Sequence, residues 1–283
     1  MSRMTPLVKA FLEHGRLAEC PVIDMHNHPD RFHGIYFPDP DPEGIIRTMD
    51  RCGVTMLTIA PHAAMADCVT GNVFMMDMVR QHPDRFRGYW WYNPHYPEEL
   101  DVAKEHTLNT PGIVGFKVHP SSHNYSLMGD AYQPVFAWAN EHKMIVLSHT
   151  WNQRGVCDAA SCRWVAERYP DMIFILGHSC YDDWGGSIAL AQEFPNVYLE
   201  LTAAERMPGF VDRAVREAGS HKMLFGTDLP WFNPQFTMGC ILFADITDGD
   251  RHAIFHGNAE RILGEHSTSF LANRDRRRTT TAV

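Results

Sequence analysis

The 283-residue sequence predicts an α/β protein that folds as a single (β/α)8 TIM barrel. Eight short runs of apolar, β-branched and aromatic residues alternate with segments whose apolar residues recur at helical spacing. Strands that are apolar almost throughout are typical of a parallel sheet covered by helices. In addition, polar side chains suited to metal binding end several of the runs, where a barrel carries its catalytic groups.

The predicted strands are separated by helices of ordinary length. The strands are 21–26, 54–60, 86–92, 112–119, 144–150, 172–178, 196–201 and 222–228. The clearest helices are 42–52, 133–142, 162–170 and 211–219. Several helices stop at turn signals such as "HPDRF", "YPDM" and "FPN". A doubly wound open sheet is the alternative, but the G-x-G-x-x-G turn of its dinucleotide-binding version does not occur in the sequence.

Composition limits the class of partner. We expect the barrel, with a short N-terminal helical extension, to cover 1–267, and the polar residues 268–283 to form a flexible tail. A net charge of −9 disfavours a nucleic-acid partner. Neither a membrane-length apolar stretch nor a signal-peptide pattern occurs, and the seven cysteines form no C-x-x-C pair. We therefore expect a cytoplasmic protein without a membrane partner, and a homo-oligomer is compatible with the sequence.

Polar side chains end five of the eight predicted strands. They are His26 and His28 in the first, Lys117 and His119 in the fourth, His149 in the fifth, His178 in the sixth and Asp228 in the eighth. Residues two apart in a strand point to the same side, so Asp24 is expected to share a face with His26 and His28. In a closed barrel, these strand ends converge on one mouth.

Several imidazoles and one carboxylate at the same mouth indicate a metal site. Burying such groups without a cation or other polar partners is costly. Imidazole nitrogens and carboxylate oxygens suit Zn²⁺, and also Mn²⁺, Fe²⁺ and Co²⁺. We expect one divalent metal, with zinc as the first choice. Histidines in predicted helices or loops, such as His252, are expected to be solvated. His62 and His95, which follow the second and third strands, could reach the mouth, but we expect them to lie outside the site.

Longer phrases extend this pattern along nearly the whole chain, namely "VIDMHNHPD", "HPDRFRGYWWYNP", "GIVGFKVHP", "IVLSHTW", "AERYPDMIFILGHSC", "FPNVYLEL", "KMLFGTDLPW" and "IFHGNAERILG". In order and spacing they resemble the amidohydrolase superfamily, in particular the amidohydrolase-related branch that includes the aminocarboxymuconate-semialdehyde-type decarboxylases. The resemblance implies a metal-dependent barrel in which His26, His28 and His149 bind the metal. It also implies that Asp228 binds the metal and shuttles a proton, and that His178 is either a ligand or an acid/base residue.

Two reactions fit this set of residues. The first is hydrolysis of a small ester, lactone or amide by a metal-activated water, with catalytic roles for Asp228 and His178. The alternative is non-oxidative decarboxylation of a small aromatic or unsaturated carboxylic acid. The phrase "KVHP" after the fourth strand is unusual for the decarboxylases and favours the hydrolase. A barrel that binds a ligand without turnover is disfavoured by the complete metal-type set, and a serine hydrolase by the lack of a G-x-S-x-G elbow.

Substrate binding is expected to fall on side chains around the mouth. The candidates are Lys117, His119, Tyr125, Trp151, Arg154 and Trp231. Lys117 has three interpretations: a carboxylated lysine that bridges two metals, a cation that binds a substrate carboxylate or oxyanion, or a tether for Asp24. We expect the unmodified lysine and one metal. Tryptophans suit an apolar or aromatic pocket, and Arg154 suits a substrate carboxylate.

Overall fold

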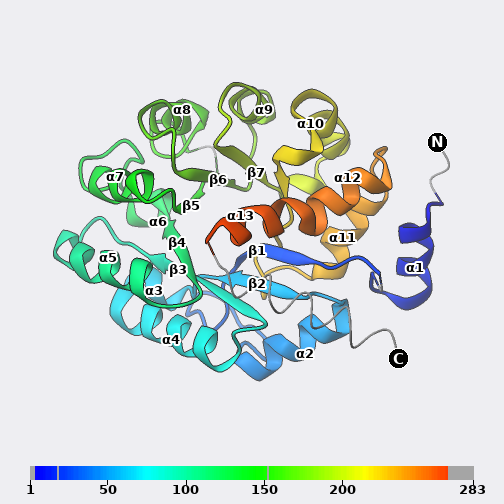
Figure 1. Cartoon of the computed structure of the whole chain (residues 1–283), viewed down its shortest axis with the longest axis horizontal. Coiled ribbons are helices and arrows are strands. Elements are labelled where there is room, and N and C mark those ends of the chain that lie inside the picture. Colours follow the sequence, from blue (N-terminus) through cyan, green and yellow to red (C-terminus); the bar gives the residue numbers. More distant parts are fainter. Residues whose placement is uncertain (1–3, 18, 152, 267–283) are drawn as a thin grey trace.

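Eight parallel strands form one sheet in the order β1 to β8, and the sheet closes into a barrel (Figure 1). The computed structural model describes residues 4–17, 19–151 and 153–266. The strands are β1 (Ile23–Asn27), β2 (Met56–Ile59), β3 (Phe86–Trp91), β4 (Ile113–Val118), β5 (Ile145–His149), β6 (Ile173–Gly177), β7 (Val197–Glu200) and β8 (Met223–Leu224). Backbone bonds from Met25 N to Phe225 O (2.9 Å) and from Asp228 N to His26 O (2.8 Å) join the last strand region to the first.

Helices surround the barrel (Figure 1). They are α1 (Pro6–His14), α2 (Pro42–Cys52), α3 (Ala63–Ala66), α4 (Cys68–Gln81), α5 (Leu100–Asn109), α6 (Pro120–His123), α7 (Gln133–Glu141), α8 (Ala159–Arg168), α9 (Trp184–Glu193), α10 (Phe210–Ala218), α11 (Pro234–Leu242), α12 (Asp248–His252) and α13 (Asn258–His266). Short turns are the 3₁₀ helices η1 (Pro97–Glu99), η2 (Ala204–Arg206) and η3 (Ser220–Lys222) and the π-helix η4 (Ala253–Gly257). None of the described helices has the length and apolar content that a bilayer crossing requires.

The structure confirms the predicted barrel, and one strand differs clearly from its expected bounds. The eighth strand was expected over 222–228, but β8 ends at Leu224. Beyond it, a Cβ at Gly226 would overlap the carboxylate of Glu200, so this position requires a residue without a side chain. Asp228 then adopts a left-handed backbone conformation with φ 55°. The chain therefore leaves the regular ladder early, and this irregularity aims Asp228 at the mouth. The expected tail, 268–283, lies outside the described residues.

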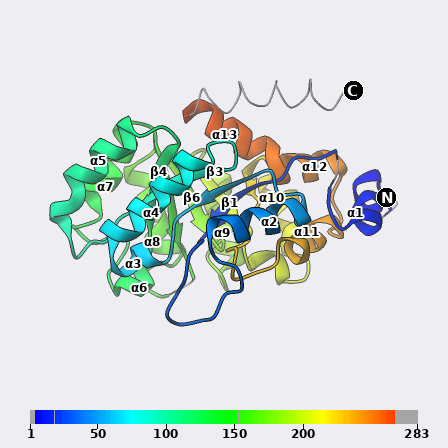
Figure 2. The same ribbon diagram turned by 90° about the horizontal axis from the view of Figure 1, so that it is seen from below.

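The apolar core has two parts. One lies between the strands and the surrounding helices, and the other fills the barrel interior. The interior part includes Tyr89 and Trp91 from β3, and it extends to Ala259, Ile262 and Leu263 of α13. α13 therefore covers one end of the barrel. In Figure 2 the blue loop between β1 and α2 projects from the opposite end, where the strands finish.

Candidate active site

The β1 strand is irregular where its histidines lie. Asp24 pairs with Leu57 and Asn27 pairs with Ile59, so three steps along β1 match two steps along β2. Such a bulge re-aims side chains next to the extra residue. It brings the Nε2 atoms of His26 and His28 to within 3.1 Å of each other. The carboxylate of Asp24 does not join them, because it accepts hydrogen bonds from Asn27 Nδ2 (2.9 Å) and Thr227 Oγ1 (2.5 Å).

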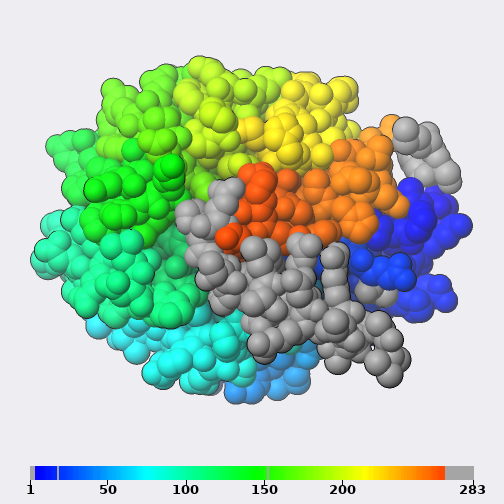
Figure 3. Space-filling model, viewed as in Figure 1, coloured from blue at the N-terminus to red at the C-terminus, as the bar shows by residue number. Residues whose placement is uncertain are grey.

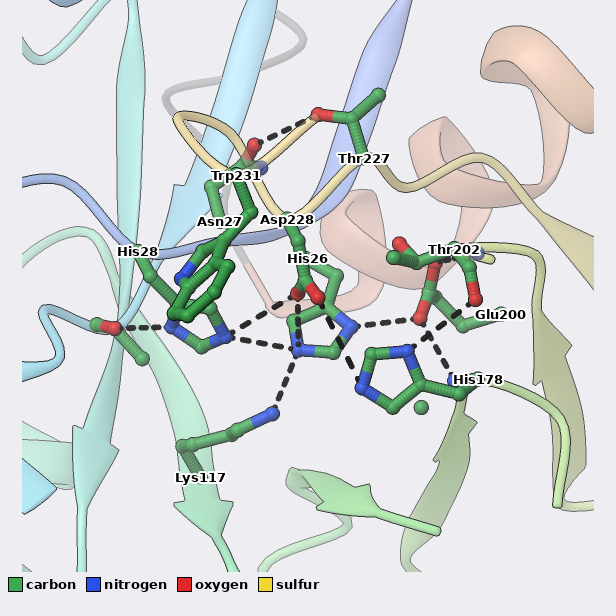
Figure 4. A network of polar contacts seen from close by, with 12 residues as sticks. His26, Asn27, His28, Lys117, His178, Glu200, Thr202, Thr227, Asp228 and Trp231 are labelled. Atoms are coloured by element: carbon green, nitrogen blue, oxygen red, sulfur yellow. Dashed lines mark hydrogen bonds and ion pairs between the residues drawn. The ribbon is translucent and has the colours of Figure 1, made fainter. Parts of the chain in front are cut away.

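Three imidazoles share one hydrogen-bonding pattern (Figure 4). In each, Nδ1 faces an oxygen, which is a backbone carbonyl for His28 and His178 and the carboxyl group of Glu200 for His26. The pairs are His26 with Glu200 Oε2 at 2.6 Å, His28 with Ala60 O at 2.6 Å and His178 with Thr202 O at 3.2 Å. We infer that each Nδ1 carries the proton, which leaves the lone pair on Nε2. This is the arrangement by which proteins orient histidine ligands toward a metal.

Asp228 completes the cluster from the segment after β8. Its Oδ1 lies 3.2 Å from His26 Nε2 and 3.4 Å from His28 Nε2, and its Oδ2 lies 3.9 Å from His178 Nε2. Oδ1 is buried and receives no hydrogen bond within the described part of the chain. A carboxylate oxygen facing imidazole lone pairs is unfavourable unless a cation lies between them. The residues present therefore fit a divalent metal.

The donor atoms of these side chains are close enough to share one ion. Among the described residues at this mouth, one donor atom each of His26, His178 and Asp228 lie within 4.8 Å of one another. His28 adds a nitrogen beside two of them. The four side chains come from three different strand ends, as expected for a barrel whose strands converge.

Burial sets the protonation of these groups. It lowers the pKa of His26 well below its usual range and that of His178 to about 4. Burial alone would raise the pKa of Asp228, but the surrounding imidazoles hold it well below its ordinary value. At neutral pH the cluster therefore holds uncharged imidazoles and an ionised carboxylate, which are the forms that bind metals.

Lys117, on β4, supplies the nearest cation. Its Nζ lies 2.7 Å from Nε2 of His26, so Lys117 contacts the imidazole and not Asp24. This is the same nitrogen that faces Asp228, so a metal ion bound there would take the place of the lysine contact. Burial lowers the pKa of the fully buried Lys117 to about 8, which leaves most of the ammonium charged at pH 7. The ring of Trp91 lies 5.9 Å from the same nitrogen. Lys117 therefore brings a desolvated positive charge to the side of the metal-type cluster.

A column of stacked rings flanks the cluster on the β3 to β6 side. The rings are Trp91, His119, His149, Trp151 and Tyr181, with successive centroids 6.2, 3.9, 6.1 and 4.1 Å apart and interplanar angles of 17° or less. His149 stacks on His119 and meets His178 edge-on at 4.7 Å. It thus lies beside the cluster, in contact with His178, and its role as a metal ligand stays a prediction.

A second aromatic group lies near His28. Trp231 Nε1 donates to Nδ1 of His62 at 3.1 Å, and the ring of His62 lies 4.0 Å from that of His28. Phe32, from the loop after β1, contacts both His62 and Trp231. The loop after β2 therefore turns the ring of His62 inward and buries it at the mouth, which is the less favoured of the two positions that the sequence left open. A cavity of about 420 Å³ adjoins Phe32 under the loop 31–41.

Two of the expected substrate-binding residues lie away from the cluster. The hydroxyl of Tyr125 accepts from Ala131 N at 3.1 Å, and its ring packs against His95 at 5.8 Å. Arg154 is exposed on the loop after β5. Their roles toward a substrate stay predictions. His119, Trp151 and Trp231 do lie at the mouth, as described above.

The sequence interpretation missed Glu200. This carboxylate ends β7, accepts from His26 Nδ1 and receives hydrogen bonds from His178 N (3.2 Å) and Thr202 N (2.6 Å). The available signal was that Glu200 is the one charged residue in the run "NVYLEL". A single acid in an apolar strand has no partner in sequence, so its link to two histidines of other strands becomes visible only in the fold.

Comparisons with known proteins agree with this picture. The family described as Amidohydrolase matches residues 23–264. An uncharacterised TIM-barrel protein from Bordetella bronchiseptica is 18% identical with a TM-score of 0.72, covering 86% of this chain and 98% of its own. A 2,6-dihydroxybenzoate decarboxylase from Rhizobium is 15% identical with a TM-score of 0.70, covering 88% and 100%.

A third solved structure holds a metal. It is a dihydroxybenzoic acid decarboxylase from a Polaromonas species with bound manganese and an inhibitor, 2-nitroresorcinol. It is 18% identical with a TM-score of 0.70, and the alignment covers 87% of this chain and 97% of that one. No curated protein sequence matches the chain significantly. At these identities the likeness of the solved structures establishes the barrel fold.

Proposed function

Because the chain belongs to the amidohydrolase family, we propose that it catalyses the non-oxidative decarboxylation of a small aromatic carboxylic acid at a divalent metal ion. The observation that carries the proposal is the position of Lys117. Its buried ammonium lies 2.7 Å from the imidazole of His26, beside the metal-type cluster, and 5.9 Å from the ring of Trp91. A flat, negatively charged acid complements these surroundings.

The structural neighbours support decarboxylation over hydrolysis. Two of the three that we describe are decarboxylases of dihydroxybenzoic acids, and one of these contains manganese. Hydrolysis, which "KVHP" favoured in the sequence, is the second candidate, since the same cluster could activate a water. The phrase "KVHP" is unusual for decarboxylases, but its Lys117 beside His26 would favour decarboxylation, because it adds a cation for the substrate's carboxylate.

His26, His28 and Asp228 would hold the metal, with His178 as the next nearest nitrogen donor and His149 as the competing one. A bound divalent ion would orient the substrate's oxygens and stabilise negative charge on them. Nitrogen and oxygen donors of this kind accept Mn²⁺ as well as Zn²⁺. The manganese-containing neighbour makes Mn²⁺ the first metal to load.

The protein's own residues account for the remaining steps. Lys117 pairs with the substrate's carboxylate, and the column from Trp91 to Tyr181 holds the ring. The bond between ring carbon and carboxylate breaks, its electron pair stays on the carbon, CO₂ leaves, and a proton takes its place. No oxidant or reductant is consumed. Asp228 is assigned as the group that passes this proton to the carbon, because its side chain is 13% exposed, whereas His178 is 3% exposed. Its carboxylate is ionised at rest, so it first takes the proton from water or from a hydroxyl of the substrate.

An assay panel tests the reaction. Purified protein loaded with Mn²⁺, and separately with Zn²⁺, is offered hydroxylated benzoic acids, with CO₂ release and the decarboxylated ring as readouts. The same preparations are offered lactones, esters and amides. We expect CO₂ from at least one hydroxybenzoate and no hydrolysis. Hydrolysis without CO₂ release would overturn the proposal in favour of the second candidate.

Replacing the assigned proton donor tests the mechanism. Asparagine keeps the shape of Asp228 but cannot deliver a proton, so Asp228→Asn should lower kcat by at least about 10²-fold. Far-UV circular dichroism should be unchanged. Asp171→Asn, on an exposed loop, is the matched control and should keep full activity. A folded, metal-loaded Asp228→Asn enzyme with normal kcat would transfer the assignment to His178.

A further inference from the structure

A second group of metal-type side chains lies at the other end of the barrel. One donor atom each of Cys20, His252 and His256 lie within 4.8 Å of one another. Cys20 precedes β1, whereas the candidate active site follows it. His252 ends α12 and His256 belongs to η4, whose Ile254 accepts a backbone hydrogen bond from Phe225 just after β8. In the described residues this cluster shares no side chain with the active site.

The two histidines have the spacing of a chelating pair. The sequence "HAIFH" places them four residues apart, so they share one helical face. His252 Nδ1 lies 3.1 Å from His256 Nε2. Two imidazoles on one tetrahedral zinc ion hold their nitrogens about 3.3 Å apart, given Zn–N bonds of about 2.0–2.1 Å. The observed separation thus needs little adjustment to accept an ion.

The other nitrogen of His256 faces an acid. Glu260 Oε1 lies 3.2 Å from His256 Nδ1, one helical turn further on in α13. A carboxylate at this position favours a proton on Nδ1 and leaves the Nε2 lone pair directed toward His252. Histidine ligands in metal sites are commonly oriented by such a carboxylate. A wide π-helical turn at His256 is also a feature often found at functional sites.

The surroundings attract a cation. The carboxylates of Asp248 and Glu260 lie near enough to the Cys20 thiol to act on it electrostatically. A local excess of negative charge favours a divalent ion, which would displace the thiol proton.

We propose that Cys20, His252 and His256 bind Zn²⁺ or a divalent ion of the same class, with a water in the fourth position. One sulfur and two imidazole nitrogens are the donor set that zinc prefers over magnesium or calcium. The ion ties the segment before β1 to the helices that follow β8. Figure 3 shows the orange surface of this region against the blue N-terminal segment, and Thr5 Oγ1 donates to Asp248 Oδ1 at 2.7 Å. The site therefore fastens the two ends of the barrel chain together.

Cobalt provides a probe that separates the two sites. A Co²⁺–thiolate bond gives an intense near-ultraviolet charge-transfer band, and the active-site donors include no sulfur. Full-length protein is stripped of metal and titrated with Co²⁺. We expect a thiolate band that saturates at about one equivalent per chain and is removed by added Zn²⁺. Asp228→Ala should leave the band in place.

Variants of the proposed ligands complete the test. The band should disappear in Cys20→Ser. In His252→Gln the apparent affinity for Co²⁺, measured from the same band, should fall by at least about 100-fold. Cys52→Ser is the matched control, because Cys52 is also fully buried but belongs to α2, and it should keep the band. The half-exposed His252 makes His252→Gln informative if Cys20→Ser does not fold. A wild-type titration without a thiolate band, or a band that survives either ligand substitution unchanged, would overturn the proposal.

Discussion

At the scale of single residues, the active-site imidazoles depend on what binds their outer nitrogens. Two of the three acceptors are backbone carbonyls, those of Ala60 and Thr202. Only Glu200 is a side chain, and it also receives two backbone N–H groups. Burial raises the pKa of Glu200 well above its usual value, although those donors favour its ionised form. Glu200 is therefore the one orienting group of the cluster that a substitution can remove.

Glu200→Gln should weaken metal binding without removing a ligand. Glutamine fills the same space but loses the charge that orients His26, so we expect the Kd for Mn²⁺ to rise by about 10–100-fold. Competition with a chelator of known affinity measures it. Glu193→Gln, at an exposed carboxylate paired with Arg163, is the control and should leave the Kd unchanged. Unaltered metal affinity in a folded Glu200→Gln protein would show that Glu200 has only a structural role.

Glu205, in η2, gives a pH-dependent prediction. Burial raises the pKa of this carboxyl to about 8, and its Oε2 is buried without a hydrogen-bond partner in the described part of the chain. Between the pKa of a glutamate in the unfolded chain and about pH 8, Glu205 keeps its proton in the folded protein but loses it in the unfolded chain. Stability therefore falls as pH rises through this window.

Glu205→Gln should remove that pH dependence. At pH 5 the wild-type carboxyl is neutral when folded, and the two proteins should differ little. At pH 8.5 the variant should be the more stable by an amount on the order of a few kcal/mol at most. Urea denaturation at both pH values measures the change. Equal wild-type-to-variant differences at the two pH values would contradict the buried neutral carboxyl.

At the scale of strands and helices, the sequence predicts where a residue lies along its strand better than it predicts which side chains that residue contacts. Strand ends could be located because apolar runs stop there, and parallel strands bring those ends together. This found His26, His28, His178 and Asp228. Which ring meets which depends on the bulge in β1 and on side-chain rotamers, and neither is visible in spacing.

The same limit explains why the sequence did not join Cys20, His252 and His256. The two histidines lie in helices, where a histidine is usually solvated, and both are half-buried. Their partner Cys20 belongs to a segment far earlier in the chain, so no local pattern joins the three. His62 follows β2 in an irregular loop, where neither helical nor strand periodicity applies. Contacts between such distant or irregular segments require the closed barrel.

The packing of α13 against the barrel leads to a prediction about stability at the same scale. Ile262 is fully buried against the barrel interior at the end away from the candidate active site. Ile262→Ala leaves a cavity there and should lower the free energy of unfolding by about 2–5 kcal/mol. Because this end carries none of the cluster, kcat should stay normal where the variant remains folded.

An exposed leucine provides the comparison for Ile262→Ala. Leu108 on α5 is 49% exposed, so Leu108→Ala should change stability by less than about 0.5 kcal/mol. Guanidinium denaturation followed by tryptophan fluorescence measures both variants. A small effect of Ile262→Ala, comparable with that of Leu108→Ala, would show that α13 does not contribute to the folded core.

At the scale of the whole molecule, we expect folding not to depend on the active-site metal. The barrel interior and the layer under the helices are built mainly from apolar side chains, although Trp91 of the interior also contacts the ring of His28. A protein stripped of its active-site metal should therefore stay folded while losing activity. The His252→Gln background isolates the active site, because the second proposed site is weakened there.

Adding Mn²⁺ to that stripped protein should stabilise it by mass action. At a free concentration of about 100 times the Kd, the gain is about 2.7 kcal/mol, which raises Tm by about 4–5 °C for a chain of this size. Differential scanning calorimetry and far-UV circular dichroism measure the shift and the retained fold. Asp228→Ala lacks the carboxylate that the imidazoles surround, so its Tm should not respond at the same concentration. Loss of far-UV signal on metal removal would mean that the metal holds the barrel itself, and an equal Tm rise in Asp228→Ala would move the metal away from the cluster of His26, His28 and His178.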